Sequence, residues 1–272
     1  MLPTEEKNLT RQESIKGYAP VNGINMYYEI HGEGEPLVLI HGGGSTIQTT
    51  FGRILPLLAM NNKVIAVELQ GHGHTNDRDA PESFEQDAKD VAALLGHLRI
   101  SKASVFGFSN GGNTAIQLVT RFPGIADKLI LASAFYKREG MIPGFFEGMK
   151  EATLDVMPRV LKDAFLEINP DSNKLQAMFN KDKARMLEFK DWEDELLRSI
   201  KIPTLIISSD HDVILPAHAV TMSTLIANSS LAILPGLHGA YIGVAEVPET
   251  GGKIIELTAE LINHFLNSED RR

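Results

Sequence analysis

The stretch "GFSNGG", residues 107 to 112, places Ser109 between two glycines where an apolar run gives way to a helical pattern. A serine raised on such a sharp strand-to-helix turn can act as a nucleophile. The same letters also fit a plain glycine-rich turn, because a G-x-S-x-G match often arises by chance. A phosphate-binding loop is disfavoured, since neither G-x-G-x-x-G nor G-x-x-x-x-G-K-[ST] occurs in the chain. Ser109 is therefore a candidate nucleophile that needs partners elsewhere.

A serine hydroxyl is a weak nucleophile at neutral pH, so it requires a histidine base and an acid that fixes the tautomer of that histidine. Asp212 and His238 each follow the end of a predicted strand, in the order acid and then histidine. Asp210 competes for the role of the acid, but its position suggests that it caps the strand end. Asp212 lies deeper in the loop, where a carboxylate can reach across, and we prefer it.

The glycine run in "LIHGGGST" follows another predicted strand and lets backbone N–H groups approach a developing oxyanion. The expected donors are the N–H groups of Gly43 and of Asn110, the residue after the nucleophile. His41 is expected to order this loop and not to act as a base. The residues expected to line the substrate pocket are Phe108, Gly42, Phe135 and Leu215.

Two further histidines, His72 and His74, lie in the segment "GHGHT". A metal site would need a third ligand and a second shell of hydrogen bonds, and the sequence indicates neither. We therefore interpret this segment as a structural turn, and we expect no metal and no cofactor.

Eight short apolar runs alternate with helical patterns along most of the chain. The first two are joined through Asn22 and Gly23, which predicts a hairpin. The clearest helix covers residues 83–98, with Ser83 and Gln86 at capping-box spacing. Strands that alternate with helices predict an α/β fold with a mostly parallel sheet covered on both faces. The predicted strands cover residues 17–22, 24–32, 36–42, 63–70, 102–108, 127–134, 203–210 and 229–236.

Roughly seventy residues separate the sixth predicted strand from the seventh, where two to six are usual in α/β proteins. This insert is helical in pattern and rich in Met and Phe, which could form a helical core or line a ligand site. We expect a helical cap over residues 135–202, an α/β core over 17–134 and 203–272, and a flexible tail over 1–16. A cap above the carboxyl ends of the strands would lie where ligands bind such sheets.

The composition narrows the function classes. The 272 residues carry a net charge of −9 with no cluster of Lys and Arg, which argues against a nucleic-acid partner. Cysteine is absent, which excludes disulfides and thiolate chemistry and suits the cytoplasm. No segment has the length of a membrane span or the pattern of a signal peptide. The expected partner is a small ester-like molecule, and a homodimer is possible.

Together these motifs resemble the α/β-hydrolase family over residues 17–268. The resemblance rests on "HGGG", "VIAVELQGHGHT", "GFSNGG", "SSDHDVILP" and "PGLHG", and the insert is similar to the helical cap of many such enzymes. It implies an eight-stranded sheet, a triad of Ser109, Asp212 and His238, and no cofactor.

Differences between this sequence and the motifs of several subfamilies of this fold narrow the range of activities that we expect. Dehalogenases and epoxide hydrolases carry an aspartate where Ser109 stands, and the elbow differs from those of proline iminopeptidases and the hormone-sensitive-lipase group. We expect a serine esterase for small or medium, mainly apolar acids. A lactonase, thioesterase, C–C bond hydrolase or acyltransferase would use the same triad, and a small-molecule receptor with little turnover is the alternative from another class.

Overall fold

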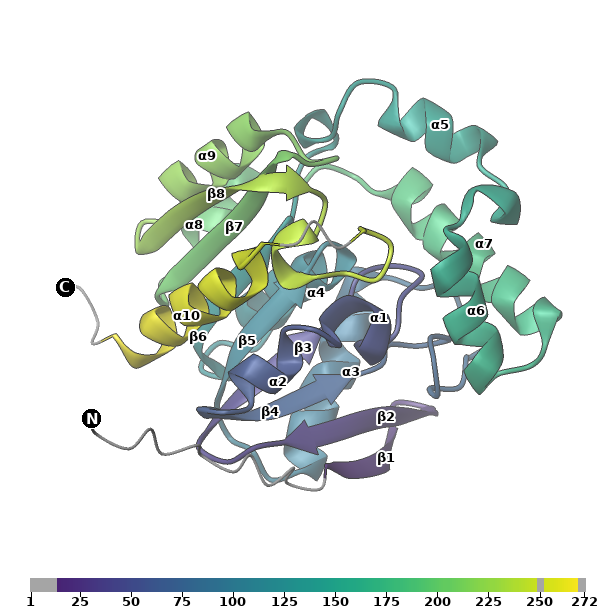
Figure 1. The fold of residues 1–272 in the computed structure, drawn as a ribbon, viewed down its shortest axis with the longest axis horizontal. Helices are drawn as coiled ribbons and strands as arrows, with labels where there is room; N and C mark the ends of the chain where they lie inside the picture. Colours follow the sequence, from purple (N-terminus) through teal and green to yellow (C-terminus); the bar gives the residue numbers. More distant parts are fainter. Residues whose placement is uncertain (1–13, 249–251, 269–272) are drawn as a thin grey trace, which may run out of the picture.

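A computed structural model describes residues 14–248 and 252–268 of the chain (Figure 1). Residues 1–13 of the expected tail lie outside the described residues, and the first strand begins at Ile15, inside the segment expected to be flexible. The strands are β1 (Ile15–Val21), β2 (Ile24–His31), β3 (Glu35–Ile40), β4 (Asn62–Val67), β5 (Ala103–Phe108), β6 (Ala126–Ala132), β7 (Thr204–His211) and β8 (Ser229–Leu237). The α-helices are α1 (Ile47–Phe51), α2 (Leu55–Leu58), α3 (Phe84–His97), α4 (Asn110–Arg121), α5 (Phe145–Glu151), α6 (Arg159–Ile168), α7 (Ser172–Glu188), α8 (Asp194–Arg198), α9 (Pro216–Leu225) and α10 (Ile254–Asn267). Short 3-10 helices are η1 (Arg138–Gly140), η2 (Leu154–Val156) and η3 (Ala240–Ile242).

The eight strands form one sheet in the order β1-β2-β4-β3-β5-β6-β7-β8. β1 and β2 form the predicted antiparallel hairpin, with Asn22 and Gly23 at positive φ in its turn. β2 pairs antiparallel with β4, and the strands from β4 to β8 are parallel. The fold is therefore the expected α/β-hydrolase sheet, and the carboxyl ends of β3, β5, β7 and β8 meet at one edge.

Helices cover both faces of the sheet, because alternate apolar side chains of the buried strands point to opposite sides. On one face Val105, Leu129 and Ile206 pack against α3, α4, α8 and α9. On the other, Phe106 and Ile207 pack against α1, α2 and α10. The predicted helix is α3, and Ser83 caps it by accepting a hydrogen bond from the Gln86 N–H at 3.1 Å.

Between β6 and β7 the chain forms a long helical insert (Figure 1). Its helices α5, α6 and α7 lie beyond the carboxyl ends of the strands, on the right of the view. α8 returns to the sheet, where Leu197 joins the core that also contains residues of α9. The insert thus has a part that overhangs the strand ends and a part that packs on the sheet.

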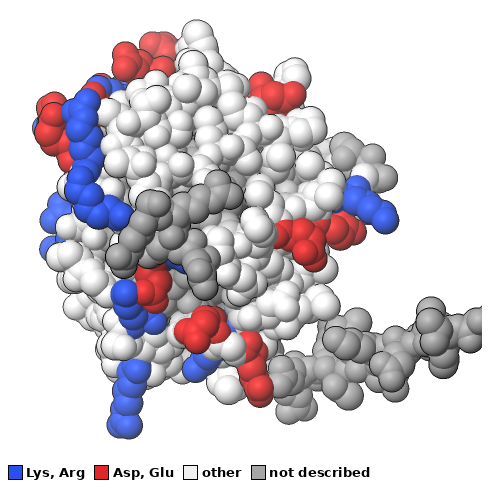
Figure 2. Space-filling model, turned by 90° about the vertical axis from the view of Figure 1, so that its left-hand side faces the viewer, with Lys and Arg blue, Asp and Glu red and all other residues white. Residues whose placement is uncertain are grey.

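The surface carries charges of both signs. On the face seen in Figure 2, groups of Lys and Arg lie next to groups of Asp and Glu, and uncharged surface lies between these mixed groups. Within the described residues, every helix is too short or too polar to cross a membrane.

Candidate active site

Ser109 occupies a strained turn between β5 and α4. Its φ of 53° and ψ of −123° are unfavourable for a residue with a side chain. The flanking glycines are required by close packing, because a Cβ at Gly107 would lie 2.2 Å from the Gly111 carbonyl oxygen and a Cβ at Gly111 would lie 2.1 Å from that of Ile40. The turn has the strained strand-to-helix form that raises a serine above a sheet.

Asp212 and His238 lie side by side at the carboxyl edge. His238 Nδ1 lies 2.6 Å from Asp212 Oδ1, and the Ile214 N–H donates to the same oxygen at 3.1 Å. Burial would raise the pKa of Asp212, but the hydrogen bond and charge of His238 and the hydroxyl of Ser133 outweigh burial and lower it. The carboxylate is therefore ionised at neutral pH and holds His238 with Nδ1 as the donor.

Sequence reasoning did not identify the residues that hold the other oxygen of Asp212. The Ser133 hydroxyl donates to Oδ2 at 2.5 Å and lies 2.8 Å from the hydroxyl of the fully buried Tyr241. Ser133 has a positive φ of 48°, an uncommon conformation for a serine that aims its side chain at the carboxylate. Tyr241 and Ser133 thus form a second layer behind Asp212.

Asp210, the competing acid, points elsewhere. Its side chain is 45% exposed, lies 2.8 Å from His211 Nδ1 and accepts the Gly236 N–H at 2.8 Å. It connects the ends of β7 and β8 at the surface, whereas Asp212 is buried.

Gly43, Asn110, Ser109 and His238 all line one cavity of about 320 Å³. Within the described chain, the backbone N–H groups of Gly43 and Asn110 donate no hydrogen bond to another protein group. Within the described residues, His238 bonds to Asp212 and makes no hydrogen bond to Ser109. In serine hydrolases such a bond often forms only when the substrate aligns the two groups.

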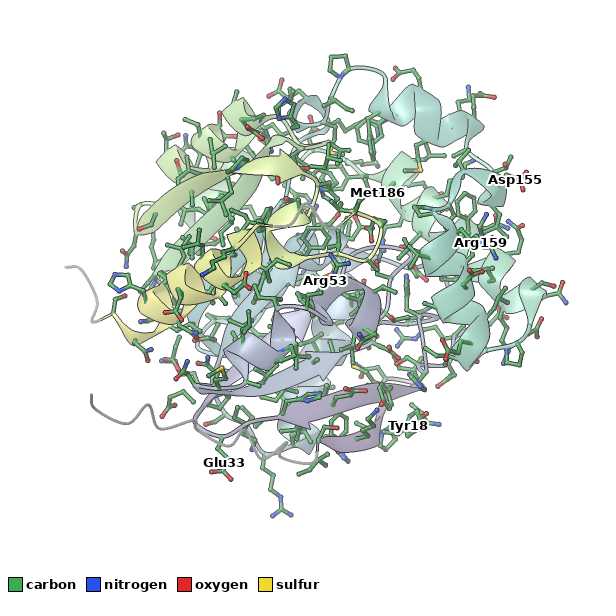
Figure 3. The ribbon with its side chains drawn as sticks, viewed as in Figure 1. Tyr18, Glu33, Arg53, Asp155, Arg159 and Met186 are labelled. Atoms are coloured by element: carbon green, nitrogen blue, oxygen red, sulfur yellow. The ribbon has the colours of Figure 1, made fainter. Side chains whose placement is uncertain are left out.

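Most of the cavity wall is apolar and comes from the insert. Figure 3 shows Met186 of α7 between the overhanging helices and the sheet, whereas Asp155 and Arg159 lie on the outer side of the insert. The Met- and Phe-rich helices form small cores and also line the cavity, so both interpretations of this segment hold. The lining residues from the insert are Phe135, Met141, Phe145, Met149, Met157, Pro158, Leu161, Met178, Phe179, Asp182, Lys183 and Met186.

Of the four residues expected to line the pocket, only Phe135 does so. Phe108 is 2% exposed, and its ring packs against that of His238 with centroids 4.8 Å apart, so it supports the histidine ring. Gly42 is covered by Phe108 and the Cβ of Ser109. Leu215 is the N-cap residue of α9 and donates its N–H to the Gly140 carbonyl. The preceding Val213 and Ile214 line the cavity in its place.

His41 orders the glycine loop, as expected. Its Nε2 accepts the Leu69 N–H at 3.0 Å, which leaves Nδ1 as the donor to the Gly42 carbonyl at 2.7 Å. Burial lowers the pKa of His41 to about 3, so the ring is neutral.

His72 does more than complete a turn. It belongs to a group of buried charged residues, here called the buried ion cluster, that joins the insert to the core: His72, Glu82, Asp87, Asp182 and Arg185. Arg185 of α7 pairs with Asp87 of α3 at 2.8 Å and with Asp182. Burial would lower the pKa of His72, but the charge and hydrogen bond of Asp182 raise it to about 9. The sequence does not predict this cluster, because its members are scattered along the chain and form no local motif.

Glu82 supplies a test of the cluster. Burial, followed by the charge of Asp182, raises its pKa from 4.5 to about 8, and Arg185 at 3.7 Å offsets only part of this. Between these pH values the unfolded chain releases a proton that the folded chain keeps, so the free energy of unfolding falls as pH rises. We expect Glu82→Gln to have a higher Tm than wild type at about pH 7, with the difference shrinking toward about pH 5. Thermal melts over this range check it, and a difference independent of pH contradicts it.

Among the described residues, no group of three or more His, Asp or Glu side chains is arranged to hold a metal ion. The chemistry available at the cavity is that of a serine, a carboxylate-bound histidine and two unpaired backbone N–H groups.

Similar proteins agree with this fold. A family model described as serine aminopeptidase, S33, matches residues 35–237. The serine hydrolase BPHL of Homo sapiens is 31% identical over 253 residues, covering 83% of this chain and 81% of that protein. A putative non-heme chloroperoxidase of Synechocystis is 28% identical over 244 residues, covering 78% of this chain and 87% of that protein.

Solved structures share the architecture. A meta-cleavage product hydrolase from Pseudomonas fluorescens superposes with a TM-score of 0.75 at 21% identity, covering 91% of this chain and 96% of that one. An enol-lactonase from Burkholderia xenovorans gives a TM-score of 0.71 at 22% identity, covering 92% and 100%. At these identities the likeness concerns the fold. Because the family model spans more than half of the sequence and the human relative is similar over most of both chains, this chain belongs to the serine aminopeptidase S33 family of α/β-hydrolases.

Proposed function

We propose that the chain is a serine hydrolase that cleaves carboxylic esters of small or medium, mainly apolar acids. The observation that carries the proposal is the 2.6 Å contact between His238 Nδ1 and the buried carboxylate of Asp212, beside a cavity that also contains Ser109 on its strained turn. Because Nδ1 is the donor to Asp212, the Nε2 atom of the neutral ring is left free to accept a proton.

The reaction follows from these positions. Ser109 Oγ attacks the ester carbonyl carbon while His238 Nε2 takes the hydroxyl proton, and the carbonyl oxygen becomes an oxyanion. The N–H groups of Gly43 and Asn110 stabilise that oxyanion. The intermediate expels the alcohol with the proton from His238, and a water molecule then releases the acid from Ser109 by the same steps in reverse order.

The apolar wall supports an acyl group without charge. The insert contributes the methionine and phenylalanine side chains, and methionine adapts easily to ligand shape. The Lys183 ammonium is engaged by the carbonyls of Lys150 and Ala152 at 2.8 and 2.7 Å. A volume of about 320 Å³ is at the small end for ligand sites and favours short and medium chains.

A chain-length series of p-nitrophenyl esters tests this proposal. We expect kcat/KM to be highest between the butanoate and the octanoate and lower for the dodecanoate, which exceeds the cavity. A fluorophosphonate should label Ser109 and abolish the activity. Labelling without turnover of any ester would contradict the esterase proposal; assays with lactones, thioesters and diketones would then identify a related hydrolase, and ligand binding without turnover would favour a receptor.

A further inference from the structure

A charged side chain of the insert, Asp182 of α7, contacts the glycine loop. Asp182 Oδ2 accepts the backbone N–H of Gly44 at 2.5 Å. The same oxygen lies 3.1 Å from where a Cβ of Gly43 would be, so the carboxylate lies against both glycines. A group from the overhanging helices therefore contacts the loop that carries one of the two oxyanion N–H groups.

Asp182 is itself held from two sides. Its Oδ1 accepts a hydrogen bond from Arg185, which Asp87 of α3 binds at 2.8 Å. Its Oδ2 lies 3.0 Å from His72 Nε2, and His72 Nδ1 lies 2.8 Å from the Gln70 carbonyl oxygen. Because a carboxylate and a carbonyl can only accept, both ring nitrogens of His72 must donate and the ring is a cation. The Gly44 N–H, which also lies 3.2 Å from Nε2, is thus directed to Asp182.

The two cations that pair with Asp182, Arg185 and His72, balance the negative charge that it places beside the oxyanion site. A lone carboxylate beside an oxyanion site would oppose the negative charge that develops in the transition state. Here Arg185 and His72 pair with Asp182, and burial alone would raise its pKa, but these two cations lower it. The paired carboxylate can accept the Gly44 N–H without presenting an unbalanced negative charge to the cavity.

The glycine loop needs such a restraint. Gly44 has a φ of 65°, a conformation that glycine adopts without strain but does not by itself enforce. An oxyanion donor is effective only when its N–H already points to the site before the reaction. Fixing the Gly44 N–H restrains the adjoining residue, Gly43, which lines the cavity.

We propose that Asp182 is a positioning residue of the oxyanion site, which is complete only while α7 is seated on the core. This inference rests on the proposed serine hydrolase function. The insert is then part of the machinery that aligns the reaction, in addition to forming a wall for the substrate.

Steady-state kinetics of Asp182 variants test the inference on the best ester of the series. For Asp182→Ala we expect kcat to fall on the order of 100-fold because the donor is misaligned. KM should stay within about twofold, because the apolar side chains that form most of the cavity wall are kept. Asp182→Asn should recover part of kcat, since its amide oxygen can still accept the Gly44 N–H. A matched control is Glu188→Gln, which removes an exposed charge from the same helix and should leave kcat unchanged.

A second variant controls for misfolding, because Asp182→Ala removes one of the carboxylates that pair with the buried Arg185 and the carboxylate that pairs with His72. The pair Asp182→Leu with Arg185→Met replaces the acceptor and the cation paired with it by apolar side chains, a replacement that proteins often tolerate. The charges that remain on Asp87 and His72 are opposite in sign and close enough to interact. The double variant should show the same loss of kcat as Asp182→Ala. Circular dichroism and Tm establish the folded fraction of each variant.

Inhibitor binding distinguishes a role of Asp182 in positioning the oxyanion donor from a role in packing the cavity wall. A trifluoromethyl ketone adds to the serine oxygen and places an oxyanion in the site, whereas the carboxylic acid product does not. Asp182→Ala should weaken the ketone by the same factor as kcat/KM and leave the affinity for the acid unchanged. Wild-type kcat in the folded double variant, a rise in KM alone, or equal losses for the ketone and the acid would overturn the inference. Failure of the proposed function is distinct, because wild type itself would then hydrolyse no ester.

Discussion

Replacing Ser109 with alanine is expected to lower kcat for the best ester on the order of a millionfold, the size of effect seen when a serine protease loses its nucleophile. The reason is that water must then attack the ester without a covalent intermediate, aided only by binding and by the oxyanion donors. The backbone turn should survive, because alanine is smaller than serine and the strain of this position is already present in wild type. The measurement is the initial rate at saturating ester, with burst titration to count active sites.

Ser101→Ala is the matched control for this variant. Ser101 is exposed and comes just before β5, at the opposite end of the strand from Ser109. It should retain full activity and full labelling by a fluorophosphonate. If Ser109→Ala kept even a tenth of wild-type activity, another residue would have to be the nucleophile.

Replacing Asp212 with alanine is the second large effect, with an expected loss of kcat of about 10⁴-fold. His238 would lose the acceptor that fixes its Nδ1 proton, so the ring could turn or adopt the wrong tautomer. The loss should exceed that of Asp182→Ala, because Asp212 acts on the base itself. KM should change little, since the buried carboxylate is not among the residues that line the cavity.

Asp210→Ala tests the competing acid under the same assay. Its carboxylate bonds to the Gly236 N–H and lies beside His211 at the surface, far less enclosed than Asp212. We expect activity within about twofold of wild type. A reversal of the two results, with Asp210→Ala inactive and Asp212→Ala active, would refute the assignment of the acid.

The sheet could be predicted from the sequence because its strands are short apolar runs with turn residues between them. The hairpin at Asn22 and Gly23 and the helix that starts after Ser83 follow from local chemistry. Asp212 and His238 could be paired in advance for a topological reason, since both follow strands whose carboxyl ends meet at one edge. Local pattern and chain order were sufficient for these features.

The pocket lining required information that the sequence does not contain locally. Phe108 ends a strand, where a single position along the chain decides which face a side chain takes, and it points beneath His238. Ser133 and Tyr241 are 108 positions apart and meet only in the fold. Asp182 belongs to a polar stretch of a long helix. Nothing near it in the sequence indicates that it contacts Gly44, 138 positions earlier.

The insert leaves the sheet at β6 and returns at β7, two strands that pair directly with each other. A segment attached in this way can be exchanged between relatives without disturbing the order of the strands. The bond from Asp182 to Gly44 limits that freedom. A transplanted insert must supply its own acceptor for the glycine loop, together with cations to balance it, so a chimera built only to change the shape of the pocket should bind its new substrate and turn it over slowly.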